Sequence, residues 1–422
     1  MTSAARSLRT TVFCPTPLGI FEQSRALQER GELESMLVDV YCDVRKRPYA
    51  WLPQGRARSF LTKRFNPGID SSRVRIRPLP SMLVRLGSRI TKGVEARNSW
   101  TFWHNHQFDR FVARQLPKLG NLAFGYESSS LFTFRRAKQL GIPTVLYQPI
   151  GVAEYALEVL GEEARRHPQL ADTLRYNWFP QEELSRRREE RQLADAIICA
   201  SSFTKRTLID VGVPAEKIFV EPYGVDQSMF APQEPKHDRF SVIWASAFTQ
   251  TKGIQYLLDA LADVGIPDLE LVVAGHPIGH DPIKPFESRF RVRRIGKVSR
   301  AELAKEMVRC HAHVFPTLLE GFGRNIIEAM ASGLPVITTA NCAGPDLIEH
   351  GKTGFIVPIR DVAGIQEHLR WLHAHPTEAR ELGLRARERV APLTPPDYRR
   401  RFADRIEAVW NAHLARAAAR AS

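Results

Sequence analysis

The sequence predicts an α/β protein made of two Rossmann-like layers. Short apolar runs alternate with longer amphipathic segments along most of the 422 residues, which is typical of βαβ units in a parallel sheet. The alternation stops at a polar, proline-containing stretch over residues 230–239 and then restarts. The length also suits two domains better than one. We therefore expect an N-terminal domain over 1–230, a C-terminal domain over 231–395 and a terminal helix over 396–422.

In the first half, six apolar runs are the predicted strands, some of them ending in a loop. They are TTVFCP (10–15), MLVDVY (36–41), LAFGYESS (122–129), TVLYQP (144–149), ADAIICAS (194–201) and IFVEPYG (218–224). Helical patterns lie between them, over 17–31, 100–120, 130–141, 154–191 and 202–213. Residues 45–97 are rich in Arg and Pro, and their pattern predicts no element.

The second half repeats this plan. Strands are predicted over 240–248, 269–277, 290–298, 313–317, 334–339 and 354–358, and helices over 251–265, 300–311, 324–333, 343–351 and 362–375. A last helix over 396–419 has an apolar stripe at Phe402, Ile406, Val409, Trp410 and Leu414. This stripe predicts packing against a domain core, with a return to the N-terminal domain as one arrangement.

The formal net charge is +14, from 60 Lys and Arg against 46 Asp and Glu. Such an excess favours acidic partners, namely nucleotide phosphates, anionic lipid or nucleic acid. Much of it is Arg distributed over helical segments such as SRRREERQ and YRRRFADR, so an ordinary solvated basic surface is an equally good interpretation.

The five cysteines are widely spaced and form no CxxC pair, so the sequence indicates neither a zinc site nor a disulfide framework. A reducing cytoplasm is the compartment that fits them. The N-terminus has no apolar stretch of signal-peptide length, and no run approaches a membrane span. We expect a cytoplasmic protein whose membrane contact, if any, is peripheral at the inner face.

The most informative segment is HVFPTLLEGFGRNIIEAMASGLPVITT, where a glycine-bearing loop joins a strand to a helix. The free N–H groups at the helix start, from about Gly323 to Ile326, form a seat for a phosphate. Glu320 precedes this seat and Glu328 follows it. Carboxylates beside an anion seat are suited to accept hydrogen bonds from hydroxyl groups. Together these groups predict a site for a nucleotide sugar.

EGFGRNIIEAMASGLPVI and the following AGPDLIEHGKTGFIVP resemble the retaining GT-B glycosyltransferases of group 1, family GT4. TKGIQYLLDAL resembles the family's element with a Lys-Gly pair at the start of a helix, and ERQLADAIICASSFTKRTLIDVGVPAEKIFVEPYGVD its segment that closes the N-terminal domain. The resemblance covers about residues 190–358. It implies the GT-B fold: two Rossmann-like domains that face each other across a cleft, with the C-terminal helix crossing back.

The resemblance also implies roles at the matching positions. Glu328 would bind the ribose hydroxyls, and Glu320 the hydroxyls of the donor sugar. Lys252 would neutralise the departing diphosphate, where a fixed cation stabilises the transition state more than the ground state. The donor-binding group would also contain Phe322, Gly323, Arg324 and Asn325 at the helix start, Lys297 in the RIGKV segment near the base, and Gly19 in the first loop. No metal or other cofactor is expected.

Three departures from the family pattern leave parts of the site open. Ala247 stands where the family usually has an Arg, so either a diphosphate cation is missing or another Arg, such as Arg324, replaces it. Gln148 and Pro149 occupy the region where many members have a His. The N-terminal loop keeps one glycine, Gly19, where the family has two.

Several residues have a plain structural interpretation beside the functional one. His104, His106 and Asp109 lack a third placed ligand, so core or surface histidines are favoured over a metal site. Tyr126 and Glu127 follow a predicted strand and either contact the acceptor or only a loop. Lys252 alone is also compatible with a surface lysine at a helix start.

The resulting expectation is a retaining glycosyltransferase that uses a UDP- or GDP-sugar and a glycan or lipid-linked acceptor, with residues 45–97 as an acceptor or membrane face. The alternative, favoured by Ala247, is a nucleotide- or glycan-binding protein that keeps the fold without catalysis. Nucleic-acid binding is not expected, because the sequence has no interleaved aromatic and basic recognition motif.

Overall fold

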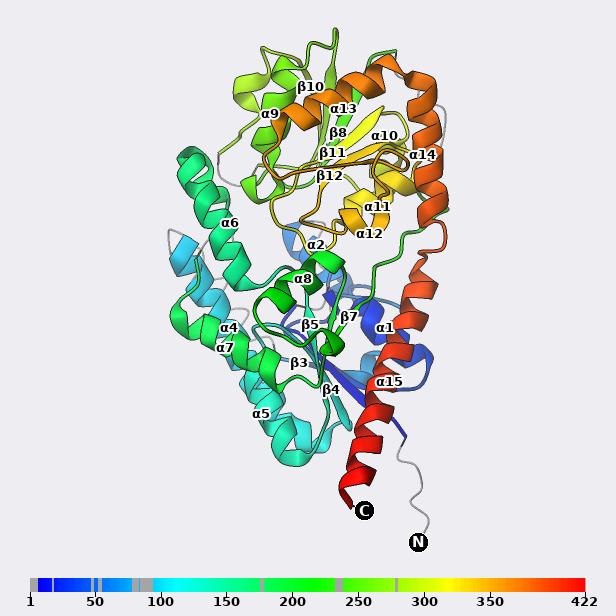
Figure 1. Ribbon diagram of the computed structural model, residues 1–422. Coiled ribbons are helices and arrows are strands. Elements are labelled where there is room, and N and C mark those ends of the chain that lie inside the picture. The colour runs from blue at the N-terminus through cyan, green and yellow to red at the C-terminus, as the bar shows by residue number, and fades with distance from the viewer. Residues whose placement is uncertain are drawn as a thin grey trace.

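The computed structural model describes residues 7–16, 19–46, 49–51, 55–77, 83, 94–174, 178–231, 238–277 and 280–421. It contains two parallel sheets, each sandwiched between helices, and the two domains are stacked end to end (Figure 1). The fold class predicted from the sequence is confirmed. In the described part of the chain, no helix is long and apolar enough to cross a membrane.

The N-terminal sheet has seven strands in the order β3-β2-β1-β4-β5-β6-β7. They are β1 (Thr10–Phe13), β2 (Leu33–Val38), β3 (Val74–Ile76), β4 (Leu122–Tyr126), β5 (Thr144–Gln148), β6 (Ala196–Cys199) and β7 (Ile218–Val220). The helices of this half are α1 (Phe21–Glu29), α2 (Arg56–Thr62), α4 (Val94–Gln115), α5 (Leu131–Leu140), α6 (Ala153–Arg166), α7 (Gln181–Leu193) and α8 (Ser202–Asp210). The region without a predicted element thus contains α2 and the edge strand β3. The single helix expected over 154–191 is divided, because Pro168 begins a 3₁₀ turn after α6.

The C-terminal sheet has six strands in the order β10-β9-β8-β11-β12-β13. They are β8 (Ser241–Ala245), β9 (Glu270–Ala274), β10 (Arg291–Gly296), β11 (Ala312–Phe315), β12 (Val336–Thr339) and β13 (Phe355–Val357). Its helices are α9 (Ile254–Asp263), α10 (Arg300–Met307), α11 (Arg324–Ala331), α12 (Gly344–Leu347), α13 (Val362–Ala374) and α14 (Pro376–Val390). The pattern analysis overlooked α14. The boundary proposed at 230/231 lies between β7 and β8, and residues 232–237 of the proposed linker lie outside the described residues.

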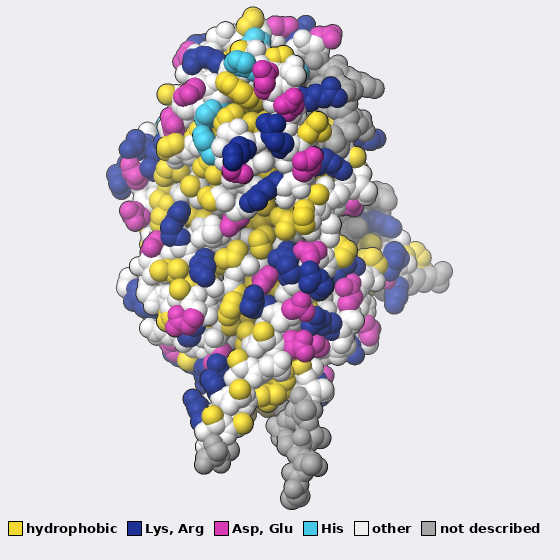
Figure 2. Space-filling model, turned by 45° about the vertical axis from the view of Figure 1, so that its right-hand side comes forward, with side chains coloured by type: hydrophobic (Ala, Val, Ile, Leu, Met, Phe, Trp, Pro, Cys, Tyr) yellow, Lys and Arg dark blue, Asp and Glu magenta, His cyan; other side chains and the backbone are white. Residues whose placement is uncertain are grey.

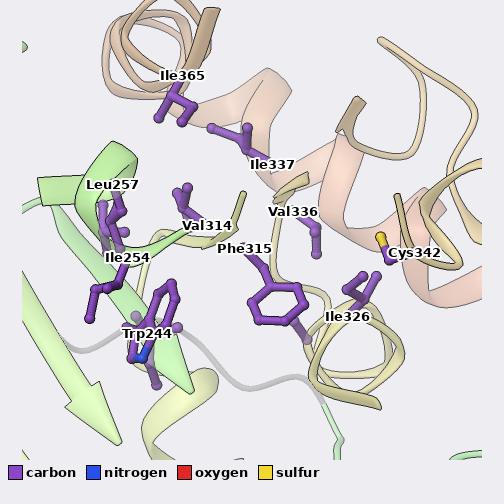
Figure 3. Packing of buried hydrophobic residues seen from close by; sticks show 14 of the residues in the cluster. Trp244, Ile254, Leu257, Val314, Phe315, Ile326, Val336, Ile337, Cys342 and Ile365 are labelled. Atoms are coloured by element: carbon purple, nitrogen blue, oxygen red, sulfur yellow. The ribbon is translucent and has the colours of Figure 1, made fainter. Parts of the chain in front are cut away.

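The C-terminal core explains why these strands are continuous apolar runs in the sequence. A parallel sheet is covered on both faces, so successive side chains of one strand are buried on opposite sides. Figure 3 shows Ile337 of β12 directed toward Ile365 of α13, whereas the adjacent Val336 lies on the side of Ile326 in α11. Burial on both faces holds α11, and with it the loop that precedes α11, against the sheet.

The terminal helix α15 (Pro395–Ala421) crosses back to the N-terminal domain, as Figure 1 shows for the red helix beside α1. Tyr398, Phe402 and Ile406 are buried in the core formed with β1, β2 and β4. Arg399 forms 2.9 Å ion pairs with both Glu22 and Glu29 of α1. The predicted apolar stripe therefore packs as expected, except that Leu414 is exposed. All five cysteines are buried thiols.

Candidate functional site

The loop between β11 and α11, together with the first two turns of α11, contains most of the predicted donor-binding residues. It turns into the helix at Gly323, whose φ of 85° is unfavourable for a residue with a side chain. In the described part of the chain, no hydrogen bond is recorded from the backbone N–H groups of Phe322, Gly323, Arg324 and Asn325. The sequence predicted a phosphate seat from about Gly323 to Ile326, but the N–H of Ile326 donates a 2.9 Å hydrogen bond to the carbonyl oxygen of Gly323. The free donors therefore begin one residue earlier, at Phe322, and end at Asn325, an arrangement suited to an anion.

Lys252 and Glu320 lie together beside this seat. The Lys252 Nζ atom lies 2.5 Å from Glu320 Oε2, and Glu320 Oε1 accepts a 3.0 Å hydrogen bond from the N–H of Gly321. Both side chains are about a fifth to a quarter exposed, so a ligand can reach them. The predicted diphosphate cation and the predicted sugar-binding acid therefore form an ion pair with each other.

The Lys-Gly pair is positioned by the sheet. Gly253 has a φ of 74°, and a Cβ atom there would lie 1.9 Å from the carbonyl oxygen of Pro316, just after β11. The carbonyl oxygen of Thr251 accepts hydrogen bonds from the N–H of Leu318 at 3.0 Å and from the Thr317 hydroxyl at 3.2 Å. The two loops are thus joined backbone to backbone, which places Lys252 over Glu320.

Glu328 lies in the second turn of α11 and pairs with Arg300 at 2.6 Å. Burial of this carboxyl raises its pKa, and the nearby Arg300 guanidinium opposes that rise. Arg300 is the first residue of α10, whose start is fixed by a capping box between Ser299 and Glu302. The ion pair consequently brings the loop after β10, with the predicted base-side residue Lys297, close to the predicted ribose-binding acid. Lys297 itself is exposed.

The remaining predicted residues lie in different settings. The Asn325 side chain donates a 3.4 Å hydrogen bond to the carbonyl oxygen of Ala245, at the end of β8. Gly19 is in the N-terminal domain, where its carbonyl oxygen accepts a hydrogen bond from the Tyr126 hydroxyl. Of its loop, Pro17 and Leu18 lie outside the described residues. Gly19 is therefore on the other side of the domain interface from the helix start.

The first domain contacts the loop between β11 and α11 directly, and the sequence did not predict this contact. We call this loop the donor loop. A Cβ atom on Gly321 would lie 1.8 Å from the carbonyl oxygen of Pro149, and the Ser201 hydroxyl donates a 2.6 Å hydrogen bond to the carbonyl oxygen of Gly321. Pro149 belongs to the region where many family members have a His. The side chain of Gln148 donates to the carbonyl oxygen of Ile150 at 2.8 Å, which shapes this turn.

Tyr223 is a second contact of this kind and a residue that sequence reasoning missed. Its ring meets Phe322 edge to face at 5.2 Å, and the Arg324 guanidinium lies 4.4 Å from its centre. Its hydroxyl contacts that of Tyr147, and its ring lies 5.2 Å from that of Tyr398 in α15. Tyr223 thus links the donor loop to the N-terminal sheet and to the crossing helix. The only signal in the sequence was its place in IFVEPYG, a segment already assigned to the family resemblance.

A third contact supports the Lys252 loop. Glu163 of α6 accepts hydrogen bonds from Gln250 at 2.6 Å and from Tyr256 at 2.8 Å, and it pairs with Arg360 at 2.9 Å. Glu163 is fully buried. A helix of the first domain therefore holds the second domain's Lys252 loop through one carboxylate.

Other candidates are accounted for by structural contacts. Glu127 pairs with Arg187 at 2.7 Å inside the N-terminal domain. Asp109 accepts hydrogen bonds from two backbone N–H groups at the start of α5, and His106 contacts Glu183. Among the residues that the structure describes, no cluster of His, Cys, Asp and Glu is arranged to hold a metal ion. A separate pocket lined by Phe240, Leu334 and Leu372 lies at the amino ends of the C-terminal strands, away from the helix start.

Among the described residues around Ala247, the nearest arginine is not available as a substitute for the missing Arg. Arg294 lies 6.0 Å from the centre of the Phe248 ring, but it is paired with Asp281 and Glu287. Arg324, in contrast, is exposed, and no ion pair within 4.0 Å joins it to a carboxylate in the described part of the chain. Arg324 is therefore a cation at the helix start that forms no ion pair with a carboxylate of the described residues.

Comparison with known proteins finds that the chain is similar to proteins described as glycosyltransferases. Residues 225–389 match the family model described as "Glycosyl transferases group 1". The chain is 28% identical over 313 residues to MMP alpha-(1->4)-mannosyltransferase of Mycolicibacterium hassiacum, covering 71% of this chain and 74% of that protein. It is 29% identical over 191 residues to D-rhamnosyltransferase WbpZ of Pseudomonas aeruginosa, covering 42% of this chain and 50% of that protein.

Solved structures share the whole architecture. Anabaena Alr3699/HepE, determined in complex with UDP and glucose, aligns with a TM-score of 0.65 and 16% identity over 95% of this chain and all of that one. Sucrose-phosphate synthase from Thermosynechococcus elongatus aligns with a TM-score of 0.62 and 18% identity over 97% of this chain and all of that one. At these identities the likeness concerns the fold alone, and it confirms the GT-B arrangement expected from the sequence resemblance.

Proposed function

We propose that this chain, whose residues 225–389 match the model of the group 1 glycosyltransferases, moves a sugar from a nucleotide-diphosphate sugar to a hydroxyl acceptor with retention of configuration. The observation that carries the proposal is the helix start of α11, where four N–H groups without a hydrogen-bond partner among the described residues lie between the Lys252–Glu320 and Arg300–Glu328 pairs. One anion seat flanked by a cation and two carboxylates matches a diphosphate with a sugar at each end.

In the proposed mechanism the donor exchanges partners with the Lys252–Glu320 pair. The diphosphate takes the Lys252 ammonium, and Glu320 becomes free to accept hydrogen bonds from the donor sugar. Negative charge grows on the diphosphate as the glycosidic bond breaks, so Lys252 and the helix start stabilise the transition state more than the bound donor. Arg324 supplies the second cation that Ala247 lacks.

At the other end of the donor, Glu328 accepts hydrogen bonds from the ribose hydroxyls while Arg300 keeps its carboxylate charged. The base lies near Lys297. The acceptor hydroxyl attacks the face that the nucleotide leaves, and the departing diphosphate accepts its proton, so the reaction needs no enzyme nucleophile. No metal enters this scheme. UDP is the first nucleotide to examine, because UDP is bound in the HepE structure that shares this fold.

The decisive experiment measures nucleotide release from a panel of UDP-, GDP- and ADP-sugars with glycan and lipid-linked acceptors, for the wild type and for Glu320→Gln and Lys252→Ala. The proposal requires sugar transfer by the wild type, loss in both variants, and a product of the donor's anomeric configuration. Transfer that both substitutions leave unchanged, or an inverted product, contradicts it.

Ala247 favours one other function, a nucleotide-binding protein without transfer. Calorimetry separates the two possibilities, since that protein would bind UDP or GDP tightly and would neither transfer the sugar nor hydrolyse any donor of the panel.

A further inference from the structure

The positive charge of the chain is concentrated in one segment. Residues 45–97 contain 14 Lys and Arg against two acids, Asp70 and Glu95, and therefore carry +12 of the formal +14. The other 369 residues hold 46 Lys and Arg against 44 Asp and Glu, so they are nearly neutral. The expectation of a dispersed charge, drawn from the Arg-rich helices, is therefore wrong.

Outside residues 45–97, the face of the molecule shown in Figure 2 is consistent with this near-neutral charge count. In the view of Figure 2, which brings the side of α14 and α15 forward, Lys and Arg side chains are interspersed with Asp and Glu. The two helices that suggested a dispersed charge, α7 and α15, pair their arginines with acids, as in Arg187–Glu183 and Arg401–Glu221. Charge on these helices is balanced locally, which leaves the excess to the segment before α4.

The described part of residues 45–64 presents aromatic side chains together with cations. Trp51 is 68% exposed and Tyr49 is 44% exposed. Lys46 and Lys63 are exposed in the same stretch, and so is Arg45, whose guanidinium also forms a 2.8 Å ion pair with Asp43. Between Asp43 and Asp70 the sequence contains no acidic residue. We call residues 45–64 the basic aromatic segment.

Contacts with α2 and the following loop give this segment a defined position. The Arg58 guanidinium donates a 3.1 Å hydrogen bond to the carbonyl oxygen of Ala50, next to Trp51. The Arg45 guanidinium lies 4.7 Å from the centre of the Phe65 ring, which in turn packs on Tyr41 at 5.5 Å. The exposed rings are therefore carried by a packed substructure of the N-terminal domain.

We propose that the basic aromatic segment docks the protein on an anionic membrane surface. Lys and Arg are attracted to anionic headgroups, and Trp and Tyr favour the interface, where the ring is apolar and the polar group stays in water. Single-stranded nucleic acid also binds cations and rings, but Ile76 and Leu83, further exposed apolar side chains within residues 45–97, are aliphatic and offer no face for base stacking. They suit the acyl boundary of a bilayer instead.

The position of the segment beside the donor domain gives docking a consequence for the reaction. The pKa of Lys63, at the end of α2, is lowered chiefly because the ammonium of Lys297 lies against it. Lys297 follows β10 in the C-terminal domain, on the side of the site where the base is proposed to bind. A membrane held by the segment therefore meets the protein at the junction of the two domains.

The test is sedimentation of the full-length protein with phosphatidylcholine vesicles and with vesicles that also contain phosphatidylglycerol. We expect binding to the anionic vesicles only, weakening with added salt. Arg45→Gln/Lys46→Gln should weaken this binding roughly 25-fold, since each basic residue near the surface contributes about a fivefold effect. The matched control is Lys284→Gln/Lys305→Gln, two exposed lysines of the C-terminal domain, which removes the same charge and should bind as the wild type does.

Trp51 provides a second readout that does not depend on charge. Lipids brominated along the acyl chain should quench part of the tryptophan fluorescence of the wild type. Trp51→Phe should keep the binding but lose that part of the quenching, whereas Trp51→Ser should lose both.

Equal binding to neutral and anionic vesicles would overturn the proposal, and so would equal losses of binding in the Arg45/Lys46 and control variants. Quenching that survives in Trp51→Phe would also contradict it. The fourth contrary outcome is binding to single-stranded RNA that is tighter than binding to vesicles and is lost in the Arg45/Lys46 variant. Calorimetry with UDP in every variant separates this proposal from the proposed function, because docking and donor binding use different residues.

Discussion

Glu163 of the first domain accepts a 2.6 Å hydrogen bond from Gln250, two residues before the Lys252 that belongs to the second domain's donor site. The same carboxylate binds Tyr256 and Arg360. Because one buried acid satisfies three groups of the other domain, the position of the Lys252 loop depends on how the domains are packed. The role proposed for Lys252 therefore depends on the same domain packing.

Lys252→Ala should lower kcat on the order of 100-fold or more, because the charge that develops on the diphosphate loses its fixed cation. The affinity for free nucleotide should change much less. Steady-state rates of nucleotide release and calorimetry with the nucleotide give the two values. Lys305→Ala, a substitution of an exposed lysine in α10, serves as the control, and an equal loss of activity there would remove the special role of Lys252.

Glu328→Gln should weaken nucleotide binding about tenfold or more, because a carboxylate that accepts two ribose hydroxyls is replaced by an amide that accepts one. Burial raises the pKa of Glu328, so the affinity of the wild type should also fall on acidification before an ordinary glutamate would be protonated. Titration calorimetry with UDP across a pH series measures both effects. An affinity in Glu328→Gln that equals the wild type would place the ribose elsewhere.

Tyr223→Ala should reduce kcat while Tyr223→Phe should retain most of it. The alanine removes the ring on which Arg324 and Phe322 rest, whereas phenylalanine keeps the ring and loses only the contact with Tyr147. A cation–π contact of this kind contributes about 0.5–2 kcal/mol, or roughly two- to thirtyfold in rate if it acts on Arg324. Equal activity of both variants would show that Arg324 does not depend on Tyr223.

Gly321→Ala should abolish turnover with a smaller effect on thermal stability. The added methyl group would lie 1.8 Å from the carbonyl oxygen of Pro149, so the donor loop and the first domain could not meet as they do here. Each domain keeps its own core and should stay folded. Kinetics and calorimetric melting of the same preparation test this, and full activity in the variant would mean that this contact is dispensable for catalysis.

His313→Asn should flatten the acid side of the stability profile. His313 is buried in β11 and donates a hydrogen bond to the carbonyl oxygen of Ile243, and burial lowers its pKa from 6.5 to about 4. Between these values the unfolded chain binds a proton that the folded chain does not, so the free energy of unfolding falls with falling pH, by about 3 kcal/mol in total. Urea unfolding at neutral pH and midway through that range measures the difference. An unchanged pH dependence in the variant would assign the acid sensitivity to other groups.

Sequence reasoning succeeded where the signal is local. The strands of both sheets follow from apolar runs, and the helix start at Gly323 follows from a glycine loop between a strand and an amphipathic helix. The pairing of Lys252 with Glu320 was not foreseen, because it joins residues 68 positions apart through backbone contacts between two loops. Each residue was assigned to the site separately, and only the fold shows that they meet.

The missed elements have physical reasons as well. Only His375 separates the helix α14 from α13, and α14 contains more charged than apolar side chains, so no gap or strong apolar stripe marks it. The strand β3 is a three-residue edge strand with two exposed positions, which gives almost no alternation to detect. Contacts such as Tyr223 with Phe322 depend on how two domains meet, and that information is spread over the whole chain.

The return of α15 to the first domain also constrains how the molecule is made. Tyr398, Phe402 and Ile406 complete the N-terminal core, yet they leave the ribosome only after the entire second domain. At ordinary rates of synthesis, the interval between the end of β7 and the start of α15 lasts roughly ten to forty seconds. Until α15 emerges from the ribosome, the apolar face of the first sheet that α15 covers is exposed to solvent. We therefore expect the nascent polypeptide to bind chaperones during this interval.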